Sequence, residues 1–113
     1  ADPYGSILGG GDEVHSYHVE GIGYDFFPKI FDSSVVDKFV KVNDKDSFET
    51  ARSLIKDEGL LIGGSCGAAT FAALEAAKSL KKGQNCLVIL PDGVRNYMRK
   101  FISDDWMEEN NLT

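Results

Sequence analysis

The spacing of apolar residues predicts a helix near the middle of the chain. Residues three to four apart form one apolar face, namely Phe48, Ala51 and Ile55, with Leu54 beside it. Asp44 or Asp46 is expected to cap the first turn, and the helix is expected to run to about Glu58. Gly59 is suited to end it, because glycine readily adopts a positive φ.

A second helix is predicted from Ser65 to about Lys82, because this stretch is rich in alanine and carries larger apolar residues at helical spacing. The small alanine side chains allow neighbouring elements to approach closely. Lys81 and Lys82 complement the negative end of the helix dipole, and Gly83 is expected to stop the helix.

Two segments have the composition of strands. Val35–Val42 is rich in β-branched residues. Cys86–Leu90 is a run of apolar residues bounded by polar and proline positions, which is typical of a strand buried on both faces of a parallel sheet. Strands that alternate with helices predict an α/β fold with a layered, mostly parallel sheet. We expect this sheet to be incomplete, because a buried strand needs a neighbouring strand on each side and the sequence contains only two convincing strands.

The two ends of the chain differ in pattern. The first third is rich in loops, and Gly9–Asp12 is expected to be an exposed, flexible connection. Near the other end, Pro91–Gly93 interrupts the apolar run, and a helical stretch is predicted from there through Phe101. Ser103 is then expected to cap a last short helix that carries Trp106.

Composition narrows the function classes. The chain has 113 residues and a net charge of −6, which argues against nucleic acid and anionic membranes as partners. No apolar run approaches the ~20 residues of a membrane span. Cys66 and Cys86 are expected to be reduced, buried thiols, as in a cytoplasmic protein. The chain starts at Ala1 without a signal-like segment, so it has the character of a processed or truncated piece.

The sequence Gly-Gly-Ser-Cys-Gly at 63–67 predicts a tight turn that opens a helix. Ser65 could cap this helix, contact a ligand, or do both. The same five residues match the nucleophile elbow of serine hydrolases, but no histidine follows Ser65, which makes a hydrolase a weak alternative. Cys66 at a helix start could be a nucleophile, yet no base partner is identifiable.

Two further patterns are weak evidence for ligand sites. His15 and His18 are spaced like a metal-binding pair but lack a nearby third ligand, so we expect exposed histidines and no metal site. Gly21–Phe26 resembles the start of a dinucleotide-binding fingerprint, except that Phe26 replaces the third glycine. A glycine loop that brings backbone and an aromatic ring to a small ligand remains open.

Several segments together resemble the eukaryotic cystathionine β-synthases. They are Val19–Pro28, Glu58–Ser65, Ile89–Met98 and Ser103–Met107. The related O-acetylserine sulfhydrylases share the Gly-Ile-Gly and Gly-Gly-Ser elements, but they typically carry a small residue and glycine where this chain has Tyr24 and Asp25. Tyr24 and the segment around Trp106 therefore favour the cystathionine β-synthases over a cysteine synthase.

The resemblance implies a pyridoxal-phosphate enzyme with a fold like that of the tryptophan synthase β subunit. It implies condensation of L-serine with L-homocysteine to L-cystathionine by β-replacement. Ser65 matches the serine that hydrogen-bonds the pyridine nitrogen of the cofactor, and a neutral hydroxyl there lets the ring stay unprotonated. The positions that match the loop beside the substrate are Gly21, Ile22, Gly23 and Tyr24.

The family's other functional parts have no counterpart in residues 1–113. None of the lysines matches the Schiff-base motif, and the phosphate-binding loop, haem segment and regulatory module are missing. We therefore expect one segment of a single catalytic domain, inactive alone and without catalytic residues of its own. The parent protein is expected to be a cytoplasmic homo-oligomer that can contain haem. A non-catalytic interaction module is the remaining alternative.

Overall fold

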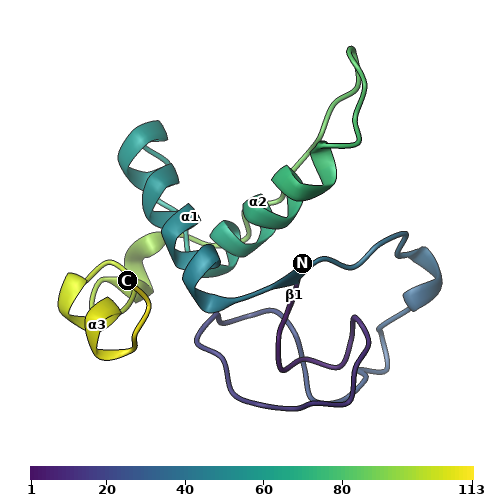
Figure 1. The fold of residues 1–113 in the computed structure, drawn as a ribbon, viewed down its shortest axis with the longest axis horizontal. Helices are drawn as coiled ribbons and strands as arrows, with labels where there is room; N and C mark the ends of the chain where they lie inside the picture. Colours follow the sequence, from purple (N-terminus) through teal and green to yellow (C-terminus); the bar gives the residue numbers. More distant parts are fainter.

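The computed structural model describes residues 1–113 and is organised around two helices, α1 (Asp44–Glu58) and α2 (Gly64–Ala77). These helices pack against each other, as Figure 1 shows. The loops of the N-terminal third lie on one side of this pair. The short helix α3 (Asp104–Glu109) lies on the other side, next to α1.

Helix α1 has the bounds and the apolar face that its spacing predicts. Phe48 and Ala51 are buried, and Ile55 packs partly buried against the same core. Its N-cap is Asn43, whose side chain accepts a hydrogen bond from the Asp46 amide at 2.8 Å, so the prediction of an aspartate cap was wrong. Gly59 ends the helix with φ of 69°, as expected for a left-handed terminal residue.

Helix α2 ends at Ala77, earlier than the predicted Lys82. Beyond Ala77 the chain forms isolated turns with exposed side chains, so no packing continues the helix there. The other end is tightly packed: a Cβ on Gly67 would lie 2.0 Å from the backbone oxygen of Ser47 on α1. The helices approach this closely because Gly67 has no side chain.

The sheet consists of two short parallel strands, β1 (Asp2–Pro3) and β2 (Lys41–Val42), with Asp2 opposite Lys41. Only the last two residues of the predicted strand 35–42 are therefore β structure. Its beginning belongs instead to a 3-10 helix, η1 (Ser33–Val35). The Asp32 carboxylate accepts the Ser34 amide, and this local hydrogen bond favours a turn over an extended strand.

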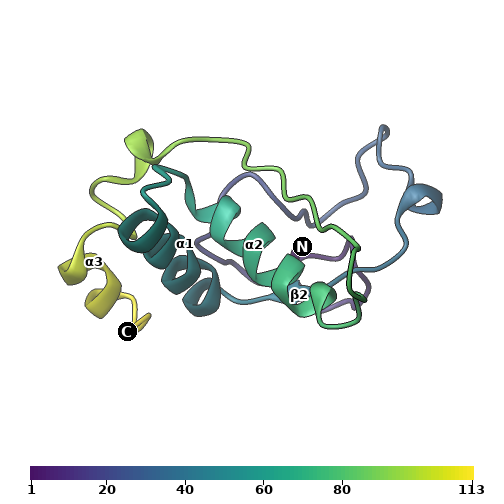
Figure 2. The ribbon, with the colours of Figure 1, turned by 90° about the horizontal axis from the view of Figure 1, so that it is seen from above.

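The prediction of a buried strand at Cys86–Leu90 was wrong for this structure. The segment runs alongside α2 (Figure 2) without forming a strand. Leu87 is 87% exposed and Ile89 is 70% exposed, whereas Val88 is half-buried. A sheet strand needs a hydrogen-bonded neighbour, and the structure provides none for this segment. Cys86 is exposed for the same reason, while Cys66 is buried as expected.

The C-terminal part supplies aromatic residues to the core. The predicted helical stretch after Gly93 is a 3-10 helix, η2 (Val94–Tyr97), followed by turns. Ser103 caps α3 by accepting the Trp106 amide at 3.3 Å, which confirms its predicted role. Phe101 stacks on Phe48 with ring centroids 5.2 Å apart. None of the helices has the length and apolar character needed to cross a membrane.

Candidate functional site

Ser65 lies in the first turn of α2, one residue after the start of the helix at Gly64. The residue is 4% exposed, and its hydroxyl, which forms no hydrogen bond to another residue of the chain, is among the polar atoms that solvent still reaches. The N-cap position belongs to Gly63, which has no side chain to cap with, so Ser65 is not the cap that its pattern allowed. The hydroxyl is therefore free to bind a ligand.

The turn before Ser65 is held by the segment that follows Pro91. The Gly63 amide donates to the backbone oxygen of Asp92 at 3.2 Å, and the Val94 amide donates to Leu61 at 3.1 Å. The Cys66 thiol donates to the same Asp92 oxygen at 3.4 Å. These contacts fix the backbone on both sides of the glycine pair, which positions the first turn of α2.

Asp92 also binds Tyr97, a pair that the sequence did not reveal. The Tyr97 hydroxyl donates to the Asp92 carboxylate at 2.5 Å. This hydrogen bond, assisted by burial, raises the pKa of Tyr97 well above its ordinary value of 10.0, so the phenol stays a neutral donor. A Cβ on Gly63 would lie 2.0 Å from the same carboxylate, so any larger residue would have to displace the Asp92 side chain from its place beside Tyr97.

The loop Gly21–Tyr24 has no regular secondary structure. Gly21 and Gly23 have φ of 86° and 73°, a conformation that side chains with a Cβ rarely adopt. Gly23 is also closely surrounded, since a Cβ there would lie 2.6 Å from the Tyr17 hydroxyl. The glycines of this loop are thus required by backbone conformation and by packing, whereas the Tyr24 side chain is 45% exposed.

Residues that sequence reasoning missed hold this loop. Tyr17 donates through its hydroxyl to the backbone oxygen of Ile22 at 3.2 Å. Ser6 forms hydrogen bonds with both the amide and the carbonyl of Tyr24, at 3.0 and 3.2 Å. No local pattern marks Ser6, because its partner is 18 positions away in the sequence.

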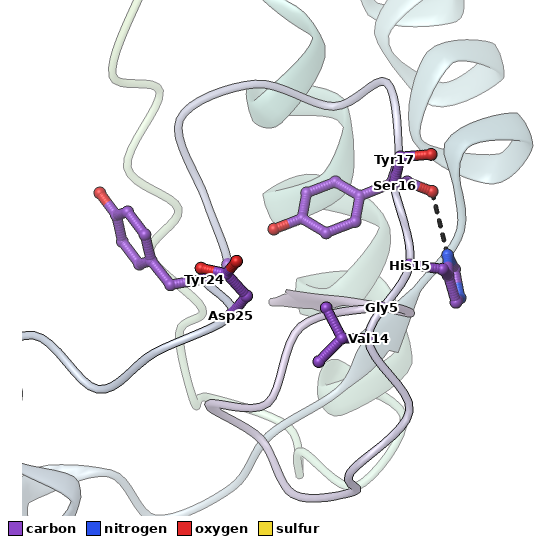
Figure 3. Close-up of a pocket in the computed structure, with 8 residues that line it drawn as sticks. Gly5, Val14, His15, Ser16, Tyr17, Tyr24 and Asp25 are labelled. Carbon is purple, nitrogen blue, oxygen red and sulfur yellow. Dashed lines mark hydrogen bonds between the residues drawn. The ribbon is translucent and has the colours of Figure 1, made fainter.

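A surface hollow of about 390 Å³ lies beside the loop. It is lined by Gly5, Val14, His15, Ser16, Tyr17, Gly23, Tyr24 and Asp25. Figure 3 shows the Tyr17 ring pointing across the hollow toward Asp25, with the Tyr24 ring directed away. Burial and the negative charges of Asp2 and Asp25 raise the pKa of Tyr17. Ser65 does not line this hollow, so the two predicted ligand contacts do not share it.

The alternative chemistries receive no support from the geometry. His15 and His18 are exposed, as expected, and no group of three or more side chains is arranged to hold a metal ion. His15 binds the backbone oxygen of Ser16, and His18 packs edge-on against Trp106. Neither histidine is hydrogen-bonded to Ser65, so the nucleophile arrangement of a serine hydrolase is not formed.

Comparison with known proteins identifies relatives over almost the whole chain. A cystathionine beta-synthase of Mus musculus is 58% identical over 111 residues, and one of Dictyostelium discoideum is 53% identical over 113 residues. These alignments cover 94% and 96% of this chain but 20% and 23% of the relatives. The chain thus spans about a fifth of the length of the curated relatives it matches.

The fold is shared with solved structures as well. The structure of the O-acetylserine dependent cystathionine beta-synthase from Helicobacter pylori superimposes with a TM-score of 0.80 at 42% identity. The match covers 88% of this chain and 32% of the other chain. This confirms the predicted α/β fold of the tryptophan synthase β-like enzymes, present here in part. The family model described as "Pyridoxal-phosphate dependent enzyme" matches residues 2–92, and the chain therefore belongs to the pyridoxal-phosphate dependent enzymes.

Proposed function

We propose that this chain is part of the catalytic domain of an enzyme that condenses L-serine with L-homocysteine to L-cystathionine by β-replacement. The high identity to eukaryotic proteins named cystathionine beta-synthase supports this assignment. Tyr24 and Asp25 support it too, because the related cysteine synthases typically carry a small residue and a glycine at these positions.

The observation that carries the proposal is the Ser65 hydroxyl. It lies at the start of a long helix in a residue that is 4% exposed, and it forms no hydrogen bond to another residue of the chain while solvent still reaches it. A hydroxyl in that setting fits the pyridine nitrogen of pyridoxal phosphate, which it can bind without delivering a full charge. The cofactor supplies an electron sink for bond cleavage next to the amino group. Ser65 holds the ring and leaves its nitrogen unprotonated.

The loop Gly21–Tyr24 is proposed to lie beside the amino-acid substrate. Its glycines leave backbone uncovered by side chains, which permits close approach by a small ligand. Tyr24, which is 45% exposed, is one of the residues that line a hollow of about 390 Å³. In this proposal the backbone of Gly21, Ile22 and Gly23 orients the substrate, and Tyr24 shapes the entrance for the second one.

We further propose that residues 1–113 form one segment of a single catalytic domain in a cytoplasmic homo-oligomer. The lysine that binds the cofactor covalently would come from outside this segment, because no lysine here matches the family motif. Lys41, for example, forms an ion pair with Asp2. The segment is therefore proposed to be inactive alone, and any haem of the parent enzyme would be bound elsewhere.

Replacing Ser65 in the complete enzyme tests the cofactor assignment. Ser65→Ala should shift the cofactor absorption spectrum and lower kcat about tenfold or more, as expected for losing a hydrogen bond of about 1.4 kcal/mol in the transition state. Ser53→Ala is the matched control, since Ser53 is exposed on α1. An unchanged spectrum and rate in Ser65→Ala would contradict the proposal.

O-acetylserine is the second candidate for the first substrate. The similar solved structure from Helicobacter pylori is of an O-acetylserine dependent enzyme, which motivates this alternative. Assays of the complete enzyme with L-serine or O-acetyl-L-serine, each with L-homocysteine, separate the two. The proposal expects a higher kcat/KM with L-serine, and a clear preference for O-acetyl-L-serine would replace it.

A further inference from the structure

The side chain of Ser6 is bonded to the backbone of Tyr24 on both sides. Its hydroxyl accepts the Tyr24 amide at 3.0 Å and donates to the Tyr24 carbonyl at 3.2 Å. The Ile7 amide donates to the same carbonyl at 3.0 Å. Ser6 is 2% exposed, so water cannot readily replace these contacts. The Ser6 hydroxyl thus bonds both backbone groups of Tyr24, which in a sheet would be bonded by the backbone of a neighbouring strand.

Ser6 is itself held by a partly buried ion pair. Lys41 donates to the Ser6 carbonyl at 2.8 Å and to the Asp2 carboxylate at 2.5 Å. The Gly9 amide donates to the same carboxylate at 2.9 Å. Burial alone would raise the pKa of Asp2, but hydrogen bonding with Lys41, Ser6 and Gly9 lowers it on balance. Asp2 therefore stays ionised at neutral pH and keeps Lys41 in place.

Gly23 of the loop packs closely against Ser6 and Pro3. A Cβ on Gly23 would lie 2.9 Å from the Ser6 Cβ and 2.8 Å from Pro3. The loop thus rests directly on the turn that contains Ser6. A shift of Ser6 must displace Tyr24, which is one of the residues that line the hollow.

We propose that Ser6 is a positioning residue that fixes the Tyr24 backbone. It thereby holds in place the loop that lies beside the substrate. This inference rests on the proposed role of the Gly21–Tyr24 loop. Ser6→Ala removes two hydrogen bonds from the Tyr24 peptide groups while leaving the Tyr24 side chain intact. None of the Ser6 hydrogen bonds reaches the turn at 63–67, so cofactor binding by Ser65 should not change.

The test uses the complete enzyme with L-serine and L-homocysteine. In Ser6→Ala we expect the KM for L-homocysteine to rise about tenfold, kcat to stay within about twofold and the cofactor absorption spectrum to be unchanged. Amide hydrogen exchange at residues 22–25 of the complete enzyme without substrate should become about tenfold faster. Ser53→Ala should alter none of these quantities.

A double variant separates positioning from a general loss of structure. In a Tyr24→Ala background, Ser6→Ala should not raise the KM further, because the side chain that it positions is absent. Unchanged amide exchange at 22–25, or a fall in kcat at constant KM, would overturn the inference. If Tyr24→Ala alone leaves the KM unchanged, the proposed role of the loop fails, whereas the exchange result still decides whether Ser6 fixes the backbone.

Discussion

The turn at 63–67 and the loop at 21–24 are both glycine-rich and both proposed to face a ligand, yet they are built differently. The turn opens a regular helix, and its Ser65 is 4% exposed. The loop has no regular structure, and its Tyr24 is 45% exposed. A nearly buried hydroxyl suits a resident cofactor, whereas an exposed residue at the edge of a hollow suits a substrate that enters and leaves.

The contacts that hold the two regions differ as well. The turn is fixed by backbone hydrogen bonds to Asp92 and by close packing of Gly67 on α1. The loop is held mainly by side chains, since Tyr17 and Ser6 bond its peptide groups and only the Ile7 amide adds a backbone hydrogen bond to Tyr24. Backbone packing thus holds the turn that is proposed to bind the cofactor. Side-chain hydrogen bonds from distant positions can hold a loop that must also admit a substrate.

The largest effect is expected from crowding the turn. In Gly67→Ala the new Cβ would lie 2.0 Å from the Ser47 backbone oxygen and 2.7 Å from the Ala51 Cβ. Neither neighbour is the far end of a flexible side chain, so α1 and α2 must move apart. We expect a loss of about 3 kcal/mol in the free energy of unfolding, measured by urea denaturation.

Gly93→Ala is the control for this crowding. Its Cβ would meet only the Leu61 backbone oxygen at 3.4 Å, an ordinary contact, and Gly93 has φ of −103°. The free energy of unfolding should fall by less than about 1 kcal/mol in Gly93→Ala. Equal losses for the two variants would show that close packing of the helices is not what holds the turn.

A smaller effect is expected from weakening the support of the loop. Lys41→Met leaves Asp2, whose side chain is 3% exposed, without its partner. Because the Lys41 side chain is itself 25% exposed, we expect about 2 kcal/mol of destabilisation rather than the larger cost of a fully buried pair. Lys78→Met removes an exposed pair with Glu75 and should cost at most about 0.5 kcal/mol in the same urea titration.

The same ion pair predicts a pH dependence. The pKa of Asp2 is lowered from 3.8, so its contribution to stability is present above that value and is lost as pH falls through the folded-state pKa. The stability difference between the protein and Lys41→Met should therefore be constant from pH 7 to about 5 and shrink below about pH 4. A difference that does not shrink at all as the pH falls well below 3.8 would contradict the assignment.

The smallest effect is expected at the Tyr97–Asp92 contact. Tyr97→Phe removes a hydrogen bond to a carboxylate that is partly solvated, so we expect a loss of about 1 kcal/mol near pH 7. Because the pKa of Tyr97 is raised, this contribution is complete below pH 10 and is lost only as pH rises through the folded-state pKa. Difference absorbance of the phenolate in the protein and in Tyr97→Phe should show Tyr97 titrating far above pH 10.

Local patterns predicted much of the backbone around the turn. The apolar spacing of α1, the terminal Gly59 and the cap at Ser103 are all confirmed, because each depends on residues within one or two helical turns. The end of α2 was predicted too late, since the helix stops where its packing stops. The prediction of a strand at 86–90 was wrong. An apolar run indicates only that a segment tends to be buried, whereas a strand also needs a hydrogen-bonded neighbour, which is missing here.

The sequence by itself determined the glycine–serine turn, the helices that flank it and the resemblance that led to the enzyme family. Such features follow from short-range spacing and from residue identities. Only the tertiary structure decided that Asp92 and Tyr97 support the turn and that Ser6, Lys41 and Asp2 support the loop. Folding brings these side chains together. A hydrogen bond between residues far apart in the sequence produces no periodic pattern from which it could be predicted.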